Sequence, residues 1–82
     1  MYNIIFSQKA ERFLDKLNDL DKERIIRALE RIRIRPENFL KKLVGESGYK
    51  FRVGDYRIIY KFDKTLSIVE ILKVEHRQGV YR

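Results

Sequence analysis

The sequence predicts a small α+β domain in which a helical hairpin packs on one face of a small, curved, mainly antiparallel sheet. The N-terminal half contains two segments with apolar residues at helical spacing, and a short apolar segment precedes them. The C-terminal half contains three strand-like apolar segments separated by turn residues. The predicted order is therefore β-α-α-β-β-β, and stacking both helices on one sheet is the economical way to bury these stripes.

The first strand and the first helix are predicted from the opening residues. Tyr2 to Phe6 is apolar and β-branched, which favours a short strand. Ser7 follows as the predicted N-cap of a helix. The apolar stripe of that helix, at i, i+3, i+4 and i+7, is Ala10, Phe13, Leu14 and Leu17.

A second helix is predicted after a connection at Asn18 to Asp21, with Asp21 as its N-cap. It ends near Arg35, because Pro36 disfavours α geometry in the residue before it. Its apolar stripe is Ile25, Ala28, Leu29 and Ile32. Its outer positions are rich in arginine, namely Arg24, Arg27, Arg31 and Arg33. This Arg face either pairs in solvent with Asp21, Glu23 and Glu30 or forms a surface for a partner or RNA.

The C-terminal half begins with a loop at residues 37–48, with one turn around Phe39 to Leu43. Strands at Tyr49–Val53 and Tyr56–Phe62 then form a hairpin around Gly54-Asp55, because glycine can take the positive φ of a type II′ turn. We expect Tyr56 and Tyr60 in the core. After a turn at residues 63–65, the nearly continuous apolar run at residues 66–74 predicts a central strand buried on both faces.

Size and charge limit the possible classes of function. The 82 residues form a single predicted domain, 1–82, without cysteine for a disulfide framework. The net charge of +7 favours nucleic acid, an acidic protein or an anionic membrane surface as a partner. No apolar run approaches the roughly 20 residues of a membrane span, and no signal peptide is recognisable, so we expect a cytoplasmic protein.

Several catalytic and cofactor motifs are missing from the sequence. Four scattered glycines form no phosphate-binding loop, and one histidine without any cysteine cannot form a His/Cys metal site. No nucleophile motif surrounds any serine. We therefore expect no cofactor, and any catalysis to be independent of metal.

The predicted hairpin carries cations and aromatic residues in alternation. Lys50 and Arg52 fall on one face of the first strand, and Arg57 follows the turn. Three positive groups on one rigid element suit a polyanionic ligand, although a solvated strand face would show the same pattern.

At the hairpin and the tail, the sequence resembles the RelE/ParE toxin superfamily, most closely the RelE-type mRNA interferases. The matching segments are Tyr49-Lys50-Phe51-Arg52, Gly54-Asp55-Tyr56-Arg57-Ile58-Ile59-Tyr60, His76-Arg77 and Val80-Tyr81. Length and element order also fit, so the likeness spans most of the chain.

The resemblance implies a toxin of a type II toxin–antitoxin system that inhibits translation by ribosome-dependent cleavage of mRNA. It implies mRNA and the ribosome as partners, and a RelB-like antitoxin that forms a hetero-oligomer with the toxin. The site residues it implies are Lys50, Arg52, Arg57, Arg77 and Tyr81. Here Arg52 replaces the lysine of the best-known pattern, the hairpin turn is shorter, and Arg77 and Tyr81 lie about two residues closer together.

Metal-free RNA cleavage can use the ribose 2′-OH as nucleophile, helped by a base, by cations at the phosphoryl oxygens and by an acid. Arg57 suits the phosphoryl oxygens, since its guanidinium offers a fork of donors, and Arg77 could add to it. Lys50 is a candidate base, because neighbouring cations disfavour its protonated form. His76 is the rival for either proton role, with Glu75 favouring its imidazolium, and Tyr81 could stack on a base or donate a proton.

Two other functions remain open at this stage. A ParE-like toxin would inhibit DNA gyrase with the same fold but without Lys50 and Arg57 as a working pair. A basic RNA- or protein-binding module would have no activity at all.

Overall fold

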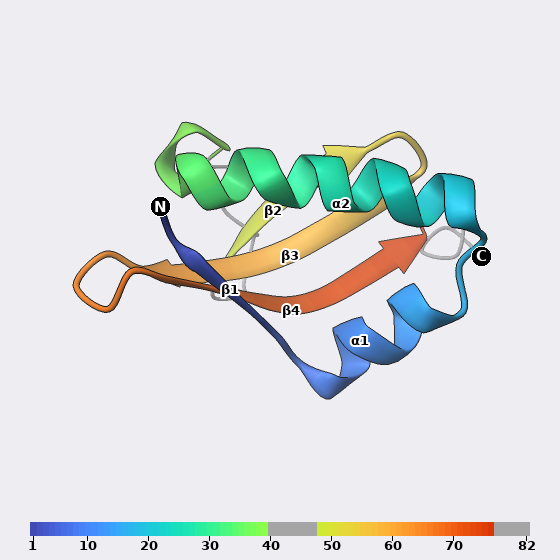
Figure 1. The fold of residues 1–82 in the computed structure, drawn as a ribbon, viewed down its shortest axis with the longest axis horizontal. Coiled ribbons are helices and arrows are strands. Elements are labelled where there is room, and N and C mark those ends of the chain that lie inside the picture. Colours follow the sequence, from blue (N-terminus) through green and yellow to red (C-terminus); the bar gives the residue numbers. More distant parts are fainter. Residues whose placement is uncertain (40–47, 77–82) are drawn as a thin grey trace.

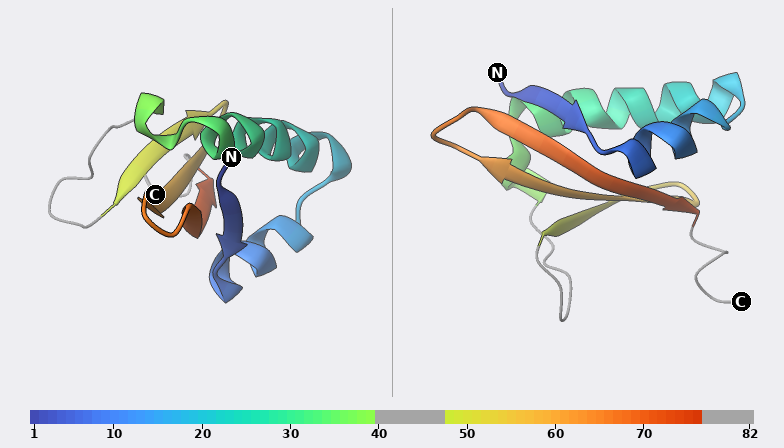
Figure 2. Two further views of the ribbon diagram at one scale, coloured as in Figure 1. Left: turned by 60° about the vertical axis from the view of Figure 1, so that its left-hand side comes forward. Right: turned by 90° about the horizontal axis from the view of Figure 1, so that it is seen from below.

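The computed structural model describes residues 1–39 and 48–76, which form one mixed sheet with both helices on the same side of it (Figure 1; Figure 2, right). The strand order is β1-β4-β3-β2, with β1 parallel to β4 and the other two pairs antiparallel. The predicted α+β class, element order and mainly antiparallel sheet are confirmed. The elements are β1 (Asn3–Phe6), α1 (Gln8–Asp15), α2 (Asp19–Ile34), the 3-10 helix η1 (Pro36–Phe39), β2 (Tyr49–Val53), β3 (Tyr56–Asp63) and β4 (Ile68–His76).

The start of each helix is fixed by a polar side chain. Ser7 caps α1 as predicted, since its Oγ accepts a hydrogen bond from the backbone N of Ala10 at 3.0 Å. The predicted N-cap of α2 is wrong: Asn18, not Asp21, is the cap, and its Oδ1 accepts from the backbone N of Asp21 at 2.9 Å. The Asp21 carboxylate instead accepts from the hydroxyl of Tyr56 at 2.7 Å, which ties α2 to β3.

The β2–β3 hairpin forms with the predicted strands, and β3 extends to Asp63. Gly54 has a φ of 56°, as the turn requires. The 3-10 helix η1 (Pro36–Phe39) extends into the start of the predicted loop at residues 37–48. Residues 40–47, which include most of the turn predicted around Phe39 to Leu43, lie outside the described part.

The core lies between the sheet and the two helices. Tyr56, Ile58 and Tyr60 of β3 pack with Ile25 and Ile32 of α2, and the two tyrosines are buried as expected. Ala10 and Leu14 of α1 join the same cluster where α1 packs against β4. No helix within residues 1–39 and 48–76 has the length and apolar character needed to cross a membrane.

Strand β4 is central, as predicted, but it is not buried on both faces. Val69, Ile71 and Val74 are buried against the helices, whereas Glu70 is exposed on the other face. Leu66 precedes the strand and is 64% exposed. The expectation of two-sided burial fails because both described helices cover the same side of the sheet, so no described helix covers the other side of β4 (Figure 2, right).

Candidate functional site

The three hairpin cations share the face of the sheet that is opposite the helices, which we call the outer face. Arg52 of β2 lies directly opposite Arg57 of β3, and Lys50 lies two residues from Arg52 on the same strand. Because side chains alternate along a strand, Phe51 and Ile58 point to the helix side, where both pack with the core. The hairpin therefore holds Lys50, Arg52 and Arg57 on one surface.

Strand β4 adds two charged residues that the sequence analysis did not select. Glu75 pairs in register with Arg57, and Lys73 pairs with Ile59, which in turn lies opposite Lys50. Two rows thus cross the outer face, Arg52-Arg57-Glu75 and Lys50-Ile59-Lys73. These rows contain four cations and one carboxylate, an excess of positive charge that makes the surface attractive to a polyanion.

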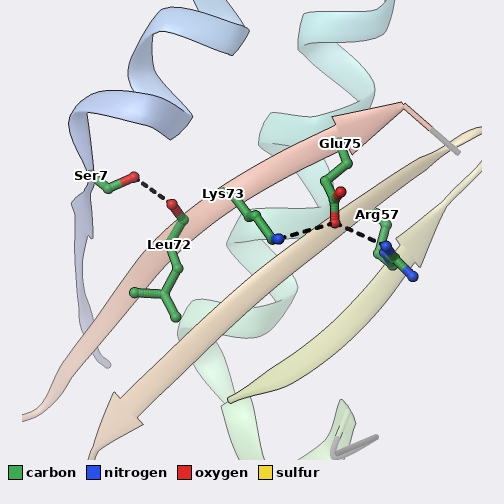
Figure 3. Close-up of polar contacts among 5 residues, drawn as sticks. All are labelled: Ser7, Arg57, Leu72, Lys73 and Glu75. Carbon is green, nitrogen blue, oxygen red and sulfur yellow. Dashed lines mark hydrogen bonds and ion pairs between the residues drawn. The ribbon is translucent and has the colours of Figure 1, made fainter. Parts of the chain in front are cut away.

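The carboxylate of Glu75 joins the two rows (Figure 3). Its Oε1 lies 2.9 Å from Nη2 of Arg57 and 3.7 Å from Nζ of Lys73. The Arg57 and Glu75 side chains are 32% and 24% exposed, so this ion pair is partly shielded from solvent. Nε of Arg57 is buried and has no hydrogen-bond partner among the described residues, so Glu75 does not satisfy the whole guanidinium.

A β-bulge in β4 explains why Lys73 and Glu75 lie on the outer face. Ile59 pairs with Lys73 but the next residue, Tyr60, pairs with Ile71, so Leu72 is an extra residue in β4. Strict alternation from Val69 and Ile71 would place Lys73 and Glu75 on the helix side. The bulge reverses which side of the sheet the residues after Leu72 face. The sequence contains no sign of this single unpaired residue, so the outward placement of Lys73 and Glu75 was not predicted.

The structure does not bring His76 together with the hairpin cations. His76 pairs in register with Tyr56, and the two rings form a T-shaped contact with centroids 5.0 Å apart. Tyr56 belongs to the helix side, so His76 and Arg57 lie on opposite faces of the sheet. Neighbouring strand residues point apart, so Glu75 lies on the outer face, where its carboxylate pairs with Arg57.

The other two predicted site residues, Arg77 and Tyr81, lie outside the described residues.

The tyrosines of β3 are structural and stay protonated. The hydrogen bond from Tyr56 to the Asp21 carboxylate raises the pKa of Tyr56. The hydroxyl of Tyr60 donates to the carbonyl of Pro36 at 2.9 Å, and burial raises its pKa to about 12. Both residues fasten β3, and hence Arg57, to the helical layer.

Two of the four arginines on the Arg face of α2 form ion pairs within the helix. Arg27 pairs with Glu23 at 2.8 Å and Arg33 pairs with Glu30 at 3.5 Å, as one of the two interpretations predicted. Arg33 also donates to the carbonyl of Tyr2. The outer face of the sheet is therefore the stronger candidate for a ligand surface.

Comparison with known protein families gives a match over nearly the whole chain. A family model described as the ParE toxin of the type II toxin–antitoxin system parDE matches residues 4–81. No curated protein sequence gives a match.

Solved structures share the whole fold. A chain of the RelBE2 toxin–antitoxin complex from Mycobacterium tuberculosis has a TM-score of 0.81 at 30% identity, covering 93% of this chain and 98% of that one. The isolated RelE toxin of E. coli has a TM-score of 0.81 at 24% identity, with 99% and 92% covered. A chain of the RelE–RelB complex from Pyrococcus horikoshii has a TM-score of 0.75 at 24% identity, with 93% and 94% covered.

Proposed function

This chain belongs to the RelE/ParE superfamily of toxins from type II toxin–antitoxin systems, and from that premise we propose that it is a ribosome-dependent endoribonuclease that cleaves mRNA. The observation that supports this function is the shared placement of Lys50, Arg52 and Arg57 on the outer face. A phosphodiester backbone needs several cations within reach of adjacent phosphates, and the two rows of the outer face supply them.

The proposed reaction needs no metal from the protein. The ribose 2′-oxygen attacks the adjacent phosphorus as its proton passes to a base, and the bond from phosphorus to the 5′-oxygen breaks as an acid protonates that oxygen. The products are a 2′,3′-cyclic phosphate and a 5′-hydroxyl. Arg57 stabilises the charge that develops on the phosphoryl oxygens.

Lys50 is the better candidate for the base, because it shares the outer face with Arg57. His76 packs on Tyr56 on the helix side and would need the end of β4 to rearrange before it reached the same phosphate. Tyr81 is the candidate for the acid, and Arg77 would add positive charge at the phosphoryl oxygens; the family resemblance alone implies both as site residues. Such a small catalytic set suits a substrate that the ribosome already holds in place.

Primer extension on translating mRNA tests this proposal. New 5′ ends should appear with the wild-type protein and disappear with Arg57→Ala. Arg12→Ala is the matched control, since it removes the same charge from an exposed position on α1. Wild-type protein that leaves translating mRNA intact would contradict the nuclease function, and equal activity of the wild type and Arg57→Ala would contradict the site.

We further propose that a RelB-like antitoxin covers the basic surface in the cytoplasm. Several of the similar structures are complexes of RelE with RelB, and a protein of charge +7 attracts an acidic, foldable segment. Co-purification with the product of the adjacent reading frame checks this partner. A chain that is stable and harmless when expressed alone would argue against it.

The description of the matching family model favours one alternative function, a ParE-like toxin that inhibits DNA gyrase. Such a toxin would cause gyrase-dependent DNA breaks, and its effect would survive Lys50→Ala and Arg57→Ala together. Cleaved mRNA without DNA breaks supports the nuclease instead.

A further inference from the structure

We propose that Glu75 positions Arg57 for phosphate and at the same time limits how tightly the outer face holds RNA, a role that rests on the nuclease function proposed above. Neither the charge pattern of the hairpin nor the resemblance to the toxin superfamily points to this residue. Its role follows from where the bulge in β4 places it.

Glu75 is the contact that fixes the Arg57 guanidinium in the described part of the chain. A single carboxylate oxygen of Glu75 accepts a hydrogen bond from Nη2 of Arg57 at 2.9 Å and lies 3.7 Å from Nζ of Lys73. On its other side Arg57 has only Arg52 as its partner in the register. Without the carboxylate, Arg57 would stand between like charges, which would drive its long side chain toward solvent.

The fold is built to present Glu75 at this point. The bulge at Leu72 turns Lys73 and Glu75 outward, and the carbonyl of Leu72 accepts a hydrogen bond from Oγ of Ser7 (Figure 3). Bulges often re-aim side chains next to functional sites. Here the bulge places a carboxylate directly beside the cation that is proposed to bind the scissile phosphate.

The same contact places Glu75 in competition with RNA. A guanidinium has five N–H donors, so one carboxylate oxygen on Nη2 leaves others for a phosphate. The negative charge of Glu75 nevertheless repels the phosphate and neutralises part of the field of four cations. Glu75 therefore improves the geometry of Arg57 at the expense of affinity.

Glu75→Gln tests both effects in one variant. It removes the charge that repels phosphate, and it leaves only the weaker hydrogen bond of a neutral amide to hold Arg57. We expect the single-turnover cleavage rate on programmed ribosomes to fall about tenfold, through loss of Arg57 orientation. We expect binding of a short single-stranded RNA, followed by fluorescence anisotropy at low salt, to tighten about threefold, with a steeper salt dependence.

Glu70→Gln is the matched control. Glu70 lies on the same strand and the same outer face, is exposed, and pairs in register with Lys61 rather than with Arg57. Glu70→Gln changes the net charge by the same amount as Glu75→Gln. Because Glu70 does not contact Arg57, this control should leave the cleavage rate unchanged and tighten RNA binding less than Glu75→Gln.

A double variant distinguishes positioning from a general loss of structure. If Glu75 acts through Arg57, Glu75→Gln should slow cleavage far less in an Arg57→Lys background than in the wild type. Glu75→Asp, which keeps the charge, should restore wild-type RNA affinity, and it serves as the test if Glu75→Gln does not fold.

An unchanged cleavage rate in Glu75→Gln, or slower cleavage with weaker RNA binding, would overturn the role of Glu75. Equal effects of Glu75→Gln and Glu70→Gln would overturn it as well. Failure of the nuclease proposal is distinguishable, because the wild-type protein would then not cleave, whereas wild-type cleavage with an unaltered Glu75→Gln rate contradicts this inference alone.

Discussion

Arg57 and Ile58 are neighbours in β3 and serve opposite purposes. Ile58 is fully buried against the helices, whereas the Arg57 side chain is 32% exposed and pairs with Glu75. Ile58 adds buried apolar area to the core, and Arg57 leaves N–H donors for a ligand. Because β3 pairs on both of its sides, the backbone that carries Arg57 is held in place, and a guanidinium on a fixed backbone loses less freedom when it binds phosphate.

Tyr60 makes the stability of the fold depend on pH in the alkaline range. Burial raises its pKa from 10.0 to about 12, so the unfolded chain ionises more easily than the folded one. The contribution to stability is complete below pH 10 and is lost as the pH rises toward 12, with a full size of about 2–3 kcal/mol.

Urea unfolding of wild-type protein and Tyr60→Phe at several pH values measures this effect. At neutral pH the variant should be less stable by about 1 kcal/mol, because the carbonyl of Pro36 loses its hydrogen bond. Above pH 10 the wild type should lose stability more steeply than the variant. Parallel curves up to pH 11.5 would contradict the buried hydroxyl.

At the scale of elements, the alternation of side chains and the turn residues predict the hairpin and the face on which its cations lie. They do not predict a local irregularity such as a β-bulge. The hairpin around Gly54 follows from a two-residue turn between alternating strands, so the placement of Lys50, Arg52 and Arg57 on one face could be predicted. The bulge at Leu72 could not, because an apolar run looks the same with or without an unpaired residue. Because of this bulge, Lys73 and Glu75 lie on the outer face and His76 lies on the helix side, which the sequence pattern did not indicate.

The start of α2 shows a second limit. Asn18 and Asp21 are both good caps three residues apart, and propensity does not rank them. In the structure Asn18 is the cap, and the Asp21 carboxylate accepts a hydrogen bond from Tyr56, a partner far away in the sequence that propensity cannot identify.

Ser7 tests the coupling between α1 and the bulge. Ser7→Ala removes the cap of Ala10 N and the hydrogen bond to the Leu72 carbonyl together. We expect the free energy of unfolding to fall by about 1–2 kcal/mol. Ser7→Thr keeps the hydroxyl and should stay close to the wild type in chemical denaturation; equal losses in the two variants would show that the hydroxyl is not the cause.

At the scale of the whole molecule, the two faces of the sheet have different roles: the helix side stabilises the fold, and the outer face is the proposed RNA surface. The helix side holds the buried cluster, and the outer face holds the cations and Glu75. Partly exposed ion pairs contribute little to folding, so residues of the outer face can be changed at a small cost in stability. We predict that mRNA cleavage depends on the cations of this face rather than on the overall charge of +7.

The most direct measurement is the single-turnover cleavage rate of ribosome-bound mRNA for two double variants of equal charge. Lys50→Ala/Arg57→Ala changes the outer face, and Lys9→Ala/Arg12→Ala changes exposed positions on α1. We predict that the first lowers the rate by about a hundredfold or more while the protein remains folded, and that the second cleaves at nearly the wild-type rate. Equal rates for the two variants would show that the outer face is not the catalytic surface.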